Sequence, residues 1–102
     1  MIERIKENEK ILDEFSLIIE KIAKDITELE EKKDDLAKLN KYYGSKNWFK
    51  DKEKLEKGKI VGIKAGVLSE DAVWNLLTII NELQERLNNI KKEIYDNKKE
   101  SR

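Results

Sequence analysis

The chain has 102 residues, enough for one domain, and its 22 Lys and Arg residues balance its 22 Asp and Glu residues. It contains no His and no Cys, which excludes His- or Cys-dependent nucleophilic catalysis, thiol redox chemistry and an ordinary zinc site. Charged residues form 43% of the chain and apolar residues 38%, a profile typical of long exposed helices. With no apolar run near the ~18 residues of a membrane span and no signal-peptide pattern, we expect a soluble, cytoplasmic protein without membrane contact.

The first predicted element is one long helix over about residues 2–40. Neither Gly nor Pro interrupts it, and at 1.5 Å per residue it would be roughly 55 Å long. Asn8 and Lys33 are polar breaks in an otherwise apolar heptad pattern. The two apolar series of this pattern lie three positions apart: Ile5, Leu12, Ile19, Ile26, and Phe15, Ile22, Leu29, Leu36.

Between residues 11 and 26 the apolar face of this helix is wider than one coiled-coil seam. A seam between two helices uses only the a and d positions of the heptad, so a wider face predicts burial against two or more helices. Here Ile11 and Ile18 occupy g positions and Leu17 lies outside the seam. We therefore predict an interaction surface formed by Ile11, Phe15, Leu17, Ile18 and Ile22.

The connector that follows holds all four glycines of the chain, between residues 44 and 66. Gly44 is predicted to end the first helix in a left-handed conformation, and Ser45 to cap a short helix over about 46–56. Residues 57–66 are predicted to form a loop. Three side chains of the short helix are expected to turn inward, namely Trp48, Phe49 and Leu55.

A second long helix is predicted over about 70–96. Ser69 is its expected N-cap, and Leu68 and Val73 are spaced for a hydrophobic staple across that cap. The polar tail 97–102 is expected to fray. Heptad spacing resumes in this helix with Val73, Ile80, Leu87, Ile94 at a and Leu76, Leu83, Ile90 at d.

These elements predict an all-α fold in one helical domain, 1–102. Two long coiled-coil-like helices joined by a connector are expected to pack antiparallel, with the short helix in the connector. The overwide apolar surface predicts a homodimer that forms a four-helix bundle. A foreign protein partner laid along the same surface, or the short helix folded over it, remains the alternative.

Charge is unevenly distributed although it sums to zero. Residues 1–36 carry 7 basic and 12 acidic side chains, a net of −5, whereas residues 37–66 carry 9 basic and 3 acidic, a net of +6. The basic stretch coincides with an aromatic and lysine-rich connector patch, formed by Tyr42, Tyr43, Lys46, Trp48, Phe49, Lys50, Lys52 and Lys54.

This patch has two interpretations. It is either a platform for stacked bases and phosphates, or a small core that closes one end of the helices with solvated lysines outside it. The small core is favoured over nucleic-acid binding for two reasons. Carboxylates interleave with the lysines, and arginine, whose guanidinium group can bind phosphate with two hydrogen bonds, is absent here. The densest carboxylate cluster, residues 28–35, is interpreted as a solvated face, since lysines neutralise it and no His completes a di-iron motif. No metal, cofactor or catalytic residue is predicted.

Two stretches resemble the signature of a protein family. Residues 42–51 resemble a "YYGSxxWxxD" block, and residues 66–77 are similar to a "GVLSEDxVxxLL" block. Both belong to a small bacterial family, largely from Firmicutes, that is catalogued as a domain of unknown function. In residues 58–65 the chain departs from the Leu-Pro-containing segment that family members tend to have. The resemblance implies a helical fold and no particular activity.

For function, the sequence predicts a non-enzymatic helical module for protein–protein interaction. The first alternative is an inhibitor of a bacterial defence system, such as an anti-CRISPR protein, encoded by a phage or mobile element. The second alternative is a nucleic-acid-binding accessory that uses the Lys/aromatic connector. An enzyme is the least expected class, because only tyrosines and carboxylates would be available for acid–base work.

Overall fold

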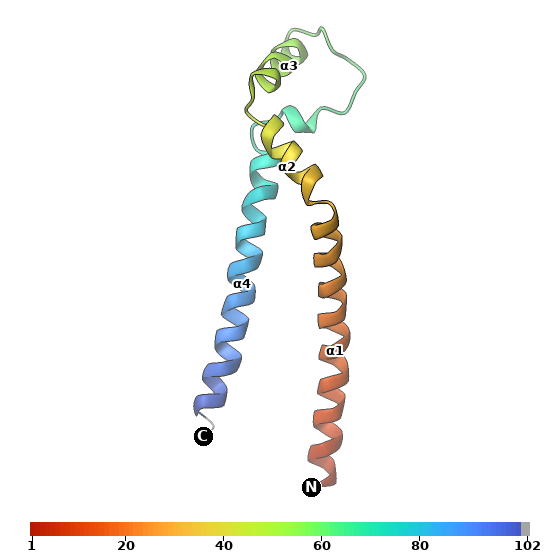
Figure 1. Cartoon of the computed structure of the whole chain (residues 1–102), viewed down its shortest axis with the longest axis vertical. Coiled ribbons are helices and arrows are strands. Elements are labelled where there is room, and N and C mark those ends of the chain that lie inside the picture. Colours follow the sequence, from red (N-terminus) through yellow and green to blue (C-terminus); the bar gives the residue numbers. More distant parts are fainter. Residues whose placement is uncertain (101–102) are drawn as a thin grey trace. The chain divides into compact units, whose positions relative to one another are not determined.

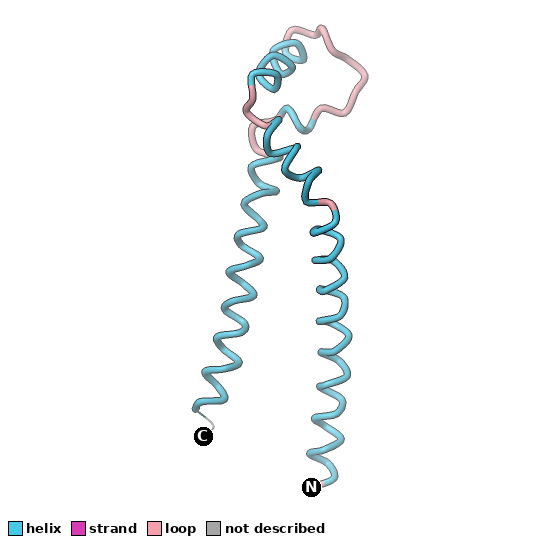
Figure 2. Tube along the Cα trace, viewed as in Figure 1, coloured by secondary structure: helices cyan, strands magenta, loops and turns pink. Residues whose placement is uncertain are grey.

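The fold is all-α, as predicted. The computed structural model describes residues 1–100, with the side chains of residues 1–98, and this part of the chain contains no strand. Its helices are α1 (Ile2–Glu31), α2 (Lys33–Tyr42), α3 (Lys46–Glu56), the 3-10 turn η1 (Gly66–Leu68) and α4 (Ala72–Glu100), as Figures 1 and 2 show. The chain divides into two compact units, residues 1–38 and a unit that begins at Leu39, and each is described by itself below.

The expected continuous helix over 2–40 is wrong, because the helix is interrupted at Lys32. This residue has φ −103° and ψ 7°. Its carbonyl accepts a hydrogen bond from the Asp35 N–H, three residues on, at 3.0 Å. Two features of the sequence explain the break. A lysine occupies the heptad core position 33, so the apolar pattern of the helix is interrupted at the residue after the break. Asp34 and Asp35 then lie in the first turn of α2, where the helix dipole favours negative charge.

The start of α3 follows the predicted local rules. Gly44 has φ 76°, a left-handed conformation that a side chain would strain. Ser45 then caps α3, and its side chain accepts a hydrogen bond from the Trp48 N–H at 3.2 Å. The predicted bounds of the short helix, 46–56, are confirmed.

The C-terminus of α3 closes in a Schellman motif. The Gly58 N–H donates to the Leu55 carbonyl at 3.1 Å, and the Lys59 N–H donates to the Lys54 carbonyl at 2.9 Å. Gly58 has φ 72°, as this motif requires of the residue after the cap. The motif folds the chain back so that residue 59 lies against the last turn of α3.

The N-terminus of α4 is capped by Ser69, as predicted. The Ser69 hydroxyl accepts a hydrogen bond from the Ala72 N–H at 3.1 Å, and regular helix begins at Ala72. On either side of this cap, Leu68 and Val73 are buried. The predicted fraying is wrong for residues 97–100, which continue α4, while residues 101–102 lie outside the described part of the chain.

Candidate interaction surfaces

The first surface is the apolar face of α1, on which no residue is buried. The five predicted interaction residues are all exposed, from 40% for Ile22 to 68% for Leu17. Helical spacing places Ile11, Ile18, Phe15 and Ile22 on one face. Leu17 is two residues from Phe15 and therefore lies on the other side of the helix. The structure thus assembles four of the five predicted residues into one strip and separates Leu17 from it.

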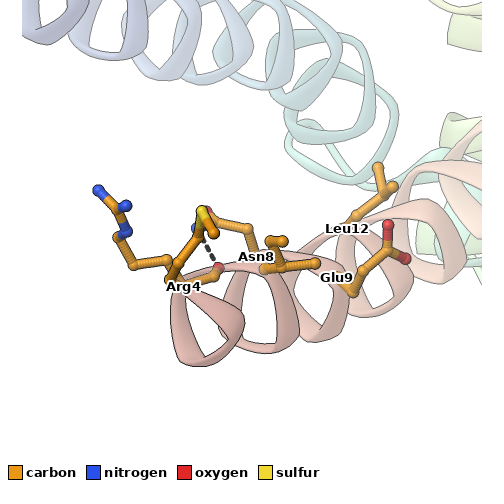
Figure 3. A pocket seen from close by; sticks show the side chains of 6 residues that line it. Arg4, Asn8, Glu9 and Leu12 are labelled. Carbon is orange, nitrogen blue, oxygen red and sulfur yellow. Dashed lines mark hydrogen bonds between the residues drawn. The ribbon is translucent and has the colours of Figure 1, made fainter.

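The strip continues along the whole helix at the a and d positions. These further residues are also exposed, namely Ile5, Leu12, Ile19, Ile26 and Leu29. Near the N-terminus the same face forms a shallow hollow, shown in Figure 3, lined by Met1, Arg4, Ile5, Asn8, Glu9 and Leu12. The Asn8 side-chain amide donates to the Arg4 carbonyl at 2.7 Å, so its N–H is satisfied within α1. Within the described residues, the second amide N–H and the Oδ1 acceptor of Asn8 are left for water or a partner.

The second apolar face lies on α4, beyond the buried Val73. Its heptad residues are exposed along the helix, with Leu76, Ile80, Leu83, Leu87, Ile90 and Ile94 all solvent-accessible. Ile79 adds an exposed side chain beside them near the start of the helix. Each long helix therefore carries an apolar stripe for which its own unit supplies no cover.

The connector patch is different, because half of it forms a small core. Trp48 is only 3% exposed, and its indole N–H donates to the Val67 carbonyl at 2.9 Å. The Tyr43 ring lies edge-on to it at 5.3 Å, and the Tyr43 hydroxyl donates to the Glu70 carbonyl. The two sequence blocks, 42–51 and 66–77, therefore meet in space.

Lys52 belongs to this core and not to a free basic surface. Its ammonium lies 5.2 Å from the centroid of the Trp48 ring and 3.0 Å from a carboxylate oxygen of Glu70. Its side chain is accordingly only 23% exposed. A cation held between an aromatic face and a carboxylate stabilises the fold, and its charge is already matched within the unit.

Tyr42 and Asp51 form a further contact between α2 and α3. The Tyr42 hydroxyl donates to Asp51 Oδ2 at 2.6 Å. This hydrogen bond, with smaller contributions from burial and from the negative charge of Asp51, raises the pKa of Tyr42 to about 12 from the usual 10.0. The bond requires the phenol to remain protonated, so it stabilises the neutral form of the tyrosine.

We expect Tyr42→Phe to lower the free energy of unfolding by about 1 kcal/mol at neutral pH, through loss of this hydrogen bond. Because the folded-state pKa is raised, the contribution is fully present below pH 10.0 and is lost as the pH rises through about 12. Urea unfolding at neutral and alkaline pH measures this contribution. Tyr95→Phe is the control, because it removes an exposed hydroxyl. If the free energy of unfolding changed with pH in the same way for the wild type and Tyr42→Phe, the stabilising role of this hydrogen bond would be contradicted.

The outer side of α3 holds the rest of the patch. Lys46, Lys50 and Lys54 are exposed, and so is Phe49, at 60%. The prediction that Phe49 turns inward is wrong. Trp48 and Phe49 are neighbours about 100° apart around the helix, and it is Trp48 that faces the core. Leu55 is half-buried.

Among the described residues, no group of three acidic side chains is placed to hold a metal ion. None of the described helices combines the length and the hydropathy that a membrane crossing requires.

A protein family described as a domain of unknown function, DUF4298, matches residues 5–90, a range that contains both sequence blocks. The expected kind of family, one without an assigned function, is confirmed, and its description names no enzyme activity. No curated protein and no solved structure matches the chain.

Proposed function

The chain belongs to the DUF4298 family, whose description assigns no activity, and from its structure we propose that it is a non-enzymatic self-association module. Two copies associate through the apolar strip of α1, formed by Ile11, Phe15, Ile18 and Ile22, in a dimeric helical bundle.

The observation that carries this proposal is the absence of any buried residue in the 30 residues of α1. A single helix in water is marginally stable, and most helical stability in proteins comes from packing of an apolar face. Burial of each large apolar side chain of the strip would contribute about 1.5–3 kcal/mol. Exposed apolar patches of several hundred Å² are uncommon on monomers and mark interaction sites.

The charges beside the two stripes suit the pairing of an α1 stripe with an α4 stripe. On α1, three of the four charged residues at the e and g positions are acidic, namely Glu9, Asp25 and Glu30. On α4, three of the five charged residues at these positions are basic, namely Arg86, Lys91 and Lys98. Charges at these positions set the choice of partner in helical bundles.

Two copies therefore carry complementary surfaces, because the acidic flanks of α1 in one copy suit the basic flanks of α4 in the other. Net charge adds no repulsion, since the chain is neutral. Two-fold association of two copies can cover the apolar stripes of α1 and α4 at once. Four-helix bundles bury such stripes in one shared core.

Thermal unfolding at several protein concentrations, followed by far-ultraviolet circular dichroism, tests this proposal. Association that stabilises the folded chain makes the melting midpoint rise with concentration. We expect such a rise from low to high micromolar concentration. A midpoint that does not change with concentration would show that α1 keeps its helix without a second copy.

A further inference from the structure

From the outer face of α3 we infer that this protein binds single-stranded nucleic acid without sequence preference. In this interaction a base stacks on Phe49 and the phosphates meet the surrounding lysines, namely Lys46, Lys50, Lys54, Lys57 and Lys59. This surface, called the α3 outer face below, is independent of the strip on α1.

The α3 outer face is defined by helical geometry. Trp48 and Leu55 turn towards the small core, and the side chains on the opposite side of the helix are exposed. Residues at spacings of three, four and seven share one helix face, which brings these positions together. The exposed residues of α3 and its C-cap are Lys46, Asn47, Phe49, Lys50, Glu53, Lys54, Glu56 and Lys57, so four lysines stand beside two acidic residues.

Phe49 is positioned as a stacking residue. Its ring lies 4.9 Å from the Trp48 ring at an interplanar angle of 83°, so the buried tryptophan fixes its orientation, while 60% of the residue stays exposed. Trp48 and Tyr43 themselves are committed to the core by their hydrogen bonds. The structure therefore separates the aromatic residues of the connector patch and leaves Phe49 available to a ligand.

The lysines form a cluster with excess positive charge. Four of them, Lys50, Lys54, Lys57 and Lys59, line one shallow hollow together with a single acidic residue, Glu53. Glu53 pairs with Lys57 at 2.5 Å. In the described part of the chain, Lys50, Lys54 and Lys59 have no such ion pair.

The Schellman motif concentrates this charge. In a Schellman motif, the two residues at the positions of Lys54 and Lys59 often make an apolar contact. With lysine at both positions, two ammonium groups are held at the same end of α3 by the Lys59 N–H bond to the Lys54 carbonyl. Three unmatched ammonium groups in one hollow are unfavourable by themselves and favour an anionic ligand with closely spaced charges.

The exposed aromatic ring decides between classes of polyanion. An acidic protein or polypeptide would use the lysines alone, whereas bases stack on aromatic rings and single strands combine stacking with phosphate contacts. Lysine contacts to the phosphate backbone carry no sequence information. The interaction is accordingly of the non-specific kind, with dissociation constants on the order of 1–100 µM.

The test is fluorescence anisotropy of labelled oligo-dT and oligo-U strands of about 12 nucleotides, titrated with the full chain. Lys50→Gln with Lys54→Gln should weaken binding about tenfold and lower the salt slope by about 1.4, since each phosphate contact of a single strand contributes about 0.7. Lys6→Gln with Lys10→Gln is the matched control, because it removes the same charge at the same spacing from α1. This control should bind like the wild type.

Phe49→Ala should weaken binding about 5- to 100-fold, and Phe49→Tyr should retain it, because every aromatic ring offers a stacking face. Circular dichroism confirms that each variant keeps its helix content. The inference is overturned if the wild type does not bind, if both double lysine variants bind alike, or if Phe49→Ala binds like the wild type. Displacement of the strand by poly-glutamate as readily as by unlabelled oligo-dT would also overturn it, in favour of an acidic polypeptide partner.

Discussion

Trp48→Ala is expected to lower the free energy of unfolding by about 3–5 kcal/mol, the usual cost of truncating an enclosed aromatic residue. Trp48 is 3% exposed and contacts Tyr43 and Phe49 edge-on. Its removal also leaves the Val67 carbonyl without the indole donor at 2.9 Å and takes the aromatic face from Lys52. The effect is large because, in the described part of the chain, this small core joins α3 to η1 and to Glu70 just before α4.

The matched control is Trp74→Ala, because Trp74 is the other tryptophan and is 59% exposed. A substitution at so open a position should cost less than about 1 kcal/mol. Urea unfolding followed by circular dichroism compares the two variants. A loss below about 0.5 kcal/mol for Trp48→Ala would contradict the small core as the element that holds the connector together.

Ile11→Lys combined with Ile18→Lys is expected to convert the proposed dimer into single chains. Both residues lie on the strip of α1, one heptad apart, and half of each side chain is exposed in the single chain. In the proposed interface the two lysines would have to lose their hydration among apolar side chains, and two charges per copy would face each other there. Light scattering should therefore give the mass of one chain, 12.1 kDa, for this variant.

A control with the same change of charge is Glu20→Gln with Thr27→Lys. Both positions are exposed and lie outside the a, d, e and g positions of the heptad. This control should keep the mass of the wild type. An equal loss of mass in both variants would show that added charge alone disperses the dimer, and the strip would lose its assigned role.

Local patterns in the sequence predicted much of the fold. The caps at Ser45 and Ser69 and the left-handed Gly44 were predictable, because each depends on residues within four positions. The break at Lys32 was not, since no Gly or Pro marks it and every residue from 28 to 35 is compatible with a helix. It coincides with the polar residue at heptad position 33 and with acidic residues that favour a new first turn.

The candidate site was predicted only in outline. A small core formed by the connector patch was predicted, but the division of α3 into a buried and an exposed side was not. Lys52 finds its carboxylate on Glu70, 18 residues away, so sequence could not distinguish it from the free lysines. The direction of Phe49 was mispredicted because both aromatic residues are apolar, and the choice between them depends on which one reaches the Val67 carbonyl.

The most direct test of self-association is the mass of the wild-type chain in solution, measured by light scattering at tens of micromolar. Association through the strip of α1 predicts twice the chain mass of 12.1 kDa, with the Ile11→Lys and Ile18→Lys double variant at the mass of one chain. A wild type that has the mass of one chain at the same concentration would contradict the proposal.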